Sequence, residues 1–437
     1  MSLPVQSAKR MWMGTVLWAV LATVAMLLYG PTFVLFFRPP EGYGGDFLQD
    51  WLSARNFLSG VPVYESLPVS LLRHTGVKLD EFLAWNAHPP VSILLVVPYS
   101  YLSYADAHFV WNLTTFPLVF LGAWLVVRGL GKRPTWRWAL PTITLGLVCA
   151  PLLDQVMYGQ FNALLTFLLC AAWAADRNER TALAGLCIGA AAAIKIVPGF
   201  LILYCLATRR WRSLVAAAVA FLGLNAVALG FFGFGAFRIY ATEAVPQVYE
   251  DNAAIWANIS VSSFWKRTLG PHANSRVIPL ADIPWLAEGL SALSRAVILA
   301  VVAIVCVRAR SLVARDRAFG AAVVAMTLVA PICWPHYFLL LIVPVGLLLV
   351  RLPAGPARWL MWVALVVIWL PQTHIAKFAI GREQAAKMQV NRQAPLTPAE
   401  NLLVASLQTY ALVALLLLTL RLPREDSPAS LGGEEAR

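Results

Sequence analysis

Two carboxylates follow the first long apolar run of the chain, in the stretch "GYGGDFLQDW". Asp46 and Asp50 are four residues apart, so they share one face if residues 46–60 form a helix lying at the membrane surface. A carboxylate at the boundary between lipid and water can serve as a general base. The alternative is a structural role, with Asp46 as the N-cap of that helix after two glycines. The residues alone leave both interpretations open.

Polar side chains also interrupt the apolar runs farther along the chain. The segment "YGQFN" contains Gln160 and Asn162, whose amides can both donate and accept hydrogen bonds and would suit sugar hydroxyls. The plainer interpretation is a polar turn between two helices. In "AAAAIKIVPGF", Lys195 precedes Pro198 and Gly199, which predict a broken helix. An ammonium at this depth either reaches the membrane interface or binds an anion such as a phosphate.

The segment "ANISVSSFWKRTLG" combines Asn258, Ser260, Lys266 and Arg267. It lies on the side that the charge pattern assigns away from the cytoplasm, where basic residues are unusual. Binding of a lipid phosphate or pyrophosphate would explain the two cations. A solvated loop would explain them equally well.

His336 lies in "APICWPHYFLLL", where two apolar runs meet. A single histidine is usually structural, but this junction faces the same side as Asp46. A neutral imidazole there could accept or donate one hydrogen bond, and an imidazolium would bind phosphate. We therefore predict a functional role for His336.

The composition decides the class of protein that must position these residues. Of 437 residues, 59% are hydrophobic and only 13% are charged, about half the charged fraction of a soluble domain. The net charge of +12 comes from short basic clusters between apolar runs, as membrane topology requires, so we do not expect nucleic-acid binding. We predict an all-α polytopic membrane protein.

About 11–13 membrane spans are expected, with helices at the outer-face membrane surface. The candidate spans are roughly 12–36, 107–128, 139–153, 161–175, 182–194, 196–208, 213–235, 291–307, 318–334, 337–350, 358–371 and 402–421. We predict one membrane domain over residues 1–421 and a disordered cytoplasmic tail at 422–437. Placing the basic clusters in the cytoplasm puts 38–89, 154–162, 243–288, 331–336 and 372–401 on the other side.

Several enzyme classes lack support in the sequence. The histidines show no HxxxH or HExxH spacing, and no GxSxG, P-loop or GxGxxG fingerprint is present. These patterns argue against a metalloprotease, a hydrolase of the GxSxG type, an ATPase and a Rossmann enzyme. We expect neither a metal ion nor another cofactor.

The ordered set of these segments resembles glycosyltransferase family 87, the polyprenyl-phosphate-mannose-dependent α-mannosyltransferases of the GT-C superfamily. The segments that carry the resemblance are "GGDFLQDWLSARNFLSGVPVY", "HPPVSILLVVPYSYL", "YGQFNALLTFLL", "ALAGLCIGAAAAIKIVPGFLILYCLATRRWR", "NISVSSFWKRTLG" and "PICWPHYFLLLIVP". Together they run from about residue 44 to 345. Tyr337 stands where the family often has a second histidine, which leaves the role of that position open.

The resemblance implies an inverting transfer of a sugar, mannose by default, from a polyprenyl-phosphate donor to a glycolipid or glycan hydroxyl. Asp46 matches the family's essential aspartate and would be the general base, and His336 matches its late histidine. The resemblance also implies that Lys195, Lys266 and Arg267 neutralise the phosphate leaving group, and that the enzyme faces the periplasm from the inner membrane. We further expect substrate binding by Asp50, Gln160, Asn162, Asn258 and Ser260.

Two other functions remain open. An O-antigen-type ligase or polymerase would use a pyrophosphate-linked donor, but its informative loops usually contain Arg and His rather than an early Asp. A transporter would show paired broken helices in two repeats, and only one such break is evident. Arabinose or another sugar remains possible as the transferred group.

Overall fold

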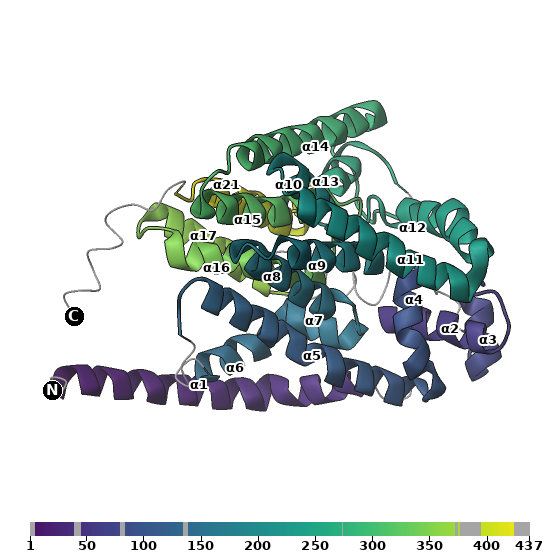
Figure 1. The fold of residues 1–437 in the computed structure, drawn as a ribbon, viewed down its shortest axis with the longest axis horizontal. Coiled ribbons are helices and arrows are strands. Elements are labelled where there is room, and N and C mark those ends of the chain that lie inside the picture. The colour runs from purple at the N-terminus through teal and green to yellow at the C-terminus, as the bar shows by residue number, and fades with distance from the viewer. Residues whose placement is uncertain are drawn as a thin grey trace.

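The computed structural model describes residues 5–38, 45–78, 84–133, 139–272, 274–371, 375 and 395–423. Most of the loop predicted at 372–401 and nearly all of the tail predicted at 422–437 lie outside these residues. Throughout the described residues the chain is helical, with one isolated bridge between Val277 and Leu396. The prediction of an all-α polytopic membrane protein is confirmed (Figure 1).

The elements follow one another along the chain in the order α1 (Val5–Phe37), α2 (Asp46–Leu58), α3 (Leu67–Thr75), α4 (Pro90–Val96), η1 (Val97–Tyr101), α5 (Tyr104–Gly129), α6 (Ala139–Leu147), α7 (Ala150–Tyr158), α8 (Asn162–Arg177), α9 (Thr181–Ile194), η3 (Val197–Phe200), α10 (Leu201–Ala207), α11 (Trp211–Ile239), η4 (Tyr240–Ala244), α12 (Val245–Asn252), α13 (Val261–Leu269), α14 (Pro284–Val307), α15 (Leu312–Val329), η5 (Pro335–Leu341), α16 (Ile342–Arg351), α17 (Pro356–Trp369), α20 (Pro398–Glu400), η6 (Asn401–Ala405) and α21 (Leu407–Leu420).

Long apolar helices form the membrane part of the chain. Four segments among the described residues are long and apolar enough to cross a bilayer: Trp12–Phe37, Tyr104–Gly129, Trp211–Asn252 and Pro284–Val307. Two bent helix pairs, α6 with α7 and α20–η6 with α21, would raise this number to six. Shorter apolar helices account for much of the remaining predicted set, so the total of about 11–13 spans stays a prediction.

The helix predicted at 46–60 is present as α2, and most of it is buried within the protein. Nine of its residues are buried, and it packs against α3, α4 and η1 at one end of the molecule (Figure 1). Phe47 stacks on Trp111 of α5 with ring centroids 5.5 Å apart. This helix is therefore part of the core, which fixes the direction in which its carboxylates point.

Helices α9 and α11 approach each other through two glycines spaced as GxxxG. A Cβ atom added to Gly185 would lie 2.0 Å from the Ser213 carbonyl oxygen, and one added to Gly189 would lie 2.1 Å from that of Ala217. Small residues at this spacing let helix backbones touch in a membrane. The contact holds α9 against α11 just before α9 ends at Ile194, the residue that precedes Lys195.

We expect Gly189→Ala to destabilise the protein by about 1–3 kcal/mol, because α9 and α11 must separate to admit the methyl group. Thermal unfolding in detergent, followed by the loss of the monodisperse chromatographic peak, measures the effect. Gly223→Ala is the matched control, since its added Cβ would meet no atom within 4 Å. Equal melting temperatures for the two variants would contradict the close contact.

Candidate functional site

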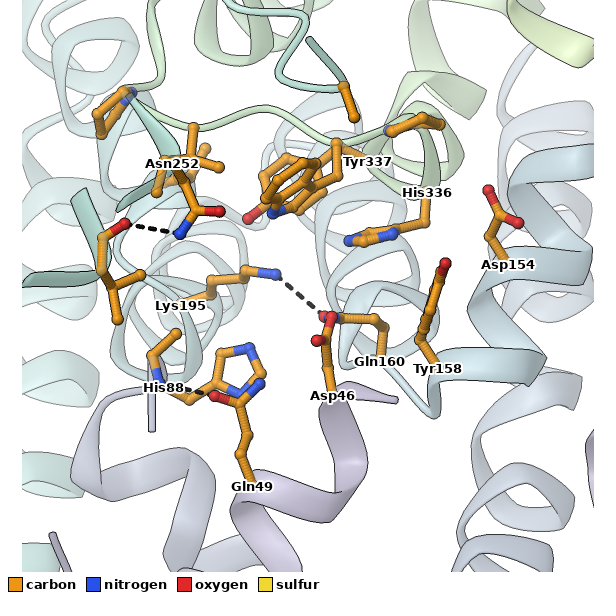
Figure 2. Close-up of a pocket in the computed structure, with 18 of the residues that line it drawn as sticks. Asp46, Gln49, His88, Asp154, Tyr158, Gln160, Lys195, Asn252, His336 and Tyr337 are labelled. Carbon is orange, nitrogen blue, oxygen red and sulfur yellow. Dashed lines mark hydrogen bonds between the residues drawn. The ribbon is translucent and has the colours of Figure 1, made fainter. Parts of the chain in front are cut away.

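A single cavity of about 850 Å³ brings distant segments of the chain together. Its walls come from α2, the segment before α4, α7, the segment that follows α9, η4, α12, and the segment that leads into η5. The polar and aromatic residues that line it are Asp46, Gln49, His88, Asp154, Tyr158, Gln160, Lys195, Tyr240, Asn252, Trp256, Trp334, His336 and Tyr337. Four residues singled out in the sequence thus meet here: Asp46, Gln160, Lys195 and His336 (Figure 2).

Asp46 is the first residue of α2 and is not its N-cap. The N-cap position is taken by Gly45, which has φ +85° and makes no side-chain capping bond. A Cβ atom on Gly45 would lie 3.2 Å from the carbonyl oxygen of Met157 and from Cα of Tyr158. The glycine therefore lets the start of α2 press against the end of α7, and Asp46 turns into the cavity.

The turn between α7 and α8 supplies Gln160. Gly159 ends α7 with φ +61°, and a Cβ atom there would come within 2.6 Å of Cβ of Phe47. Trp111 of α5 donates a hydrogen bond from its indole N–H to the Gly159 carbonyl at 2.8 Å. The polar turn predicted at this place exists, and it carries Gln160 into contact with α2.

A chain of hydrogen bonds joins three of the cavity residues. Lys195 Nζ donates to Gln160 Oε1 at 3.1 Å, and Gln160 Nε2 donates to Asp46 Oδ2. The lysine thereby orients the amide so that its N–H faces the carboxylate. The amide leaves the carboxylate able to accept further hydrogen bonds, as a general base must.

The predicted break after α9 is present and explains how Lys195 reaches this place. The helix ends at Ile194, and Lys195 has extended φ and ψ angles of −147° and 129° before η3 begins. Its ammonium lies 4.3 Å from the centroid of the Tyr337 ring, in the range of cation–π attraction. Tyr337, whose role the resemblance left open, is thus the aromatic partner of the lysine.

Burial sets the proton affinity of Asp46. Loss of water contact raises the pKa of its carboxyl above the ordinary aspartate value, although His88 and Lys195 act in the opposite direction. A raised pKa strengthens a carboxylate as a proton acceptor. The site therefore combines a base with neighbouring cations.

His336 lies in η5 beside two tyrosines. Its ring centroid is 5.8 Å from that of Tyr158 and 5.3 Å from that of Tyr337. Its Nε2 atom is buried and has no hydrogen-bond partner among the described residues. In Figure 2 the imidazole points toward Lys195 and Asp46, so it is available to a substrate in the cavity.

Comparison with known proteins places the chain among the glycosyltransferases. The model of glycosyltransferase family 87 matches residues 85–331, which is more than half of the chain. The chain belongs to glycosyltransferase family 87. The resemblance seen in the sequence is thereby confirmed, and the chain is a membrane glycosyltransferase. The matched residues include Gln160 and Lys195, whereas Asp46 and His336 lie beyond the two ends of the match.

Two mycobacterial relatives are similar to this chain. The chain is 27% identical over 296 residues to the polyprenol-phosphate-mannose-dependent alpha-(1-2)-phosphatidylinositol pentamannoside mannosyltransferase of Mycolicibacterium smegmatis, with 65% of this chain and 67% of that one covered. It is 30% identical over 175 residues to the alpha-(1->3)-arabinofuranosyltransferase of Mycobacterium tuberculosis, with 38% and 40% covered. No solved structure matches the chain significantly.

Asp50 and Asn162, also predicted as substrate-binding residues of this family 87 chain, do not line the cavity. Asp50 is completely buried and accepts a hydrogen bond from His88 Nδ1. Asn162 begins α8, is completely buried, and its amide has no partner among the described residues. Their direct contact with substrate stays a prediction that this arrangement does not favour.

Asn258 and Ser260 hold the segment that leads to His336. Asn258 Nδ2 donates to the Pro331 carbonyl at 3.1 Å, and its Oδ1 accepts from the Cys333 amide at 3.0 Å. Ser260 caps α13 by accepting from the Ser263 amide. Both side chains are buried outside the cavity lining, so they position the site.

Lys266 and Arg267 are adjacent on α13 but face different surroundings. Lys266 forms an ion pair with Glu288 at 2.7 Å. Arg267 is completely buried and hydrogen-bonds the Asn258 carbonyl at 2.7 Å and Asn401 Oδ1 at 2.8 Å. Neither residue lines the cavity, so neither one is placed to neutralise a phosphate there.

His88 lines the cavity, although the sequence did not single it out. In the sequence it is one of several histidines that lack the spacing of metal ligands. The polar "NAH" before two prolines in an apolar stretch was the available signal. Among the described residues, no three His, Cys, Asp or Glu side chains are grouped so as to hold a metal ion. Independence from metal remains a prediction to be tested.

Proposed function

We propose that this chain transfers mannose from a polyprenyl-phosphate donor to a hydroxyl of a glycolipid or glycan, with inversion at the anomeric carbon. The convergence of Asp46 with Lys195 and His336 in one cavity carries the proposal. The mycobacterial relatives support the choice of substrates, because they are named for a polyprenol-phosphate-mannose donor and for phosphatidylinositol mannoside acceptors.

The reaction needs one base and one site for a leaving anion. Asp46 accepts the proton of the acceptor hydroxyl as its oxygen attacks the anomeric carbon. The bond from that carbon to the phosphate oxygen breaks, and its electron pair leaves with the polyprenyl phosphate. Lys195 stabilises the negative charge that develops on the phosphate, and His336 contributes a hydrogen bond to donor or acceptor.

The side of the membrane belongs to the same proposal. If the basic clusters lie in the cytoplasm, the segments that supply the cavity face the periplasm of the inner membrane. A donor that is flipped outward on its lipid would enter there. An arabinofuranosyl donor is the second candidate, because one relative is named for transfer of that sugar.

The direct test is sugar transfer by the purified protein in lipid nanodiscs. Radiolabelled polyprenyl-phosphate mannose, polyprenyl-phosphate arabinose and a polyprenyl-pyrophosphate-linked sugar would each be offered with an extract of membrane glycolipids. We expect labelled glycolipid from the mannose donor, with the inverted anomeric configuration relative to the donor. Transfer from the arabinose donor alone would replace mannose in the proposal. Transfer from a pyrophosphate-linked donor alone, or from none of the donors, would contradict it.

A further inference from the structure

Both the backbone and the ring of His88 are held by specific contacts. Its Nδ1 atom lies 2.8 Å from Asp50 Oδ2, and its backbone N–H donates to Asn86 Oδ1 at 2.8 Å. The Tyr64 hydroxyl donates to the His88 carbonyl at 2.5 Å. Its ring also meets Phe161 edge-on, with centroids 5.2 Å apart. Backbone and ring are therefore both fixed.

Asp50, the partner of His88, is itself held in place by hydrogen bonds. Asp50 is completely buried, and its second carboxyl oxygen accepts from Asn86 Nδ2 at 3.2 Å. The same amide also donates to Ser53 Oγ at 3.0 Å and to the Gln49 carbonyl at 3.1 Å. A buried carboxylate is costly unless it is paired and hydrogen-bonded. This network ties the segment before α4 to α2 and orients one imidazole.

The orientation leaves one ring nitrogen for the cavity. Because Asp50 occupies Nδ1, Nε2 is the atom of His88 that a ligand in the cavity can meet. Figure 2 shows the ring near Asp46 and Lys195, across the cavity from His336. Lys195 already donates a hydrogen bond to Gln160 and lies over the ring of Tyr337. It therefore does not by itself surround a phosphate group.

We propose that His88, positioned by Asp50, contacts the phosphate of the lipid donor and of the lipid phosphate product. The proposal rests on the proposed function. The donor phosphodiester carries one negative charge, and cleavage of the bond to the sugar leaves its electron pair on the phosphate as a second charge. The Nε2–H of His88 donates a hydrogen bond to that oxygen and transfers no proton, while Nδ1 stays hydrogen-bonded to Asp50. The proton of the acceptor goes to Asp46.

The test compares binding of a polyprenyl phosphate with binding of the polyprenol of the same chain length. The ratio of the two dissociation constants measures recognition of the phosphate separately from the lipid chain. In wild type the phosphate should bind more tightly. In His88→Gln, which can still hydrogen-bond Asp50 but lacks the imidazole Nε2 that faces the cavity, this preference should fall about tenfold. His74→Gln is the matched control, because His74 pairs with Asn56 outside the cavity lining.

The outcomes separate this inference from the function on which it rests. If wild type does not distinguish phosphate from alcohol, both fail. If wild type prefers the phosphate and His88→Gln keeps that preference in full, only the role of His88 fails. Asp50→Asn provides a second route should His88→Gln not fold. Because Asp50 is a positioning residue, Asp50→Asn should lower the preference for polyprenyl phosphate over polyprenol. A loss of packing alone would leave this preference unchanged.

Discussion

Replacing Asp46 with asparagine should reduce sugar transfer by at least about a hundredfold, the usual contribution of a general base. Asparagine keeps the size of the side chain and can still accept a hydrogen bond from Gln160, but it cannot take the acceptor proton. Initial rates with saturating polyprenyl-phosphate mannose in nanodiscs measure the loss. Binding of the donor should change much less, because the phosphate contacts do not involve Asp46.

The control for this variant is Asp106→Asn. Asp106 forms an exposed ion pair with Arg38 and lies outside the cavity lining, so its loss should change the rate little.

The pH dependence of sugar transfer gives a second readout of the role of Asp46. Since burial raises the pKa of Asp46, activity should appear as the pH rises through a value above the ordinary aspartate range. A wild-type rate for Asp46→Asn would show that another group takes the proton.

Replacing Arg267 with methionine should destabilise the protein by about 3 kcal/mol or more. Its guanidinium is completely buried and also bonds Ser263 and Ser406 through its two terminal nitrogens. Methionine fills part of the volume but leaves several buried acceptors without donors, and each such loss costs about 1–3 kcal/mol. Thermal and denaturant unfolding in detergent measure the change.

The adjacent residue, Lys266, provides the control for the stability of Arg267→Met. Lys266→Met removes a cation whose partner, Glu288, is 60% exposed, so it should cost less than about 1 kcal/mol. Arg267 also donates a hydrogen bond to the backbone carbonyl of Asn258. The side chain of Asn258 in turn hydrogen-bonds the backbone of Pro331 and Cys333. Residual folded Arg267→Met should therefore transfer sugar slowly. Equal stability of the two variants would contradict the structural role assigned to Arg267.

Local patterns in the sequence were enough to predict several parts of the site. The helix that begins at Asp46, the break at Lys195 and the junction at His336 each depend on neighbouring glycines, prolines or apolar runs, and each one is present. The topology argument, which placed Asp46 and His336 on one side, agrees with their meeting in one cavity. Which side of the membrane that is remains part of the proposal.

Other features of the site depend on contacts between distant parts of the chain, so local patterns in the sequence do not predict them. Lys266 and Arg267 look alike in the sequence, and only packing against residues 401–406 buries one of them. His88 acquires its place through Asp50, which lies 38 residues away. Spacing along one helix cannot reveal either relation, because the partners come from separate segments that the fold brings together.

The glycines of α9 also indicate where directed evolution could change what this enzyme accepts. The wall that carries Lys195 cannot gain side-chain volume at Gly185 or Gly189, since backbone atoms of α11 fill that space. In contrast, α12 has no buried residue, yet its Val248 and Asn252 line the cavity. Libraries that vary this helix should therefore yield altered sugar or acceptor preference with little loss of expression, whereas libraries on α9 should mostly yield misfolded protein.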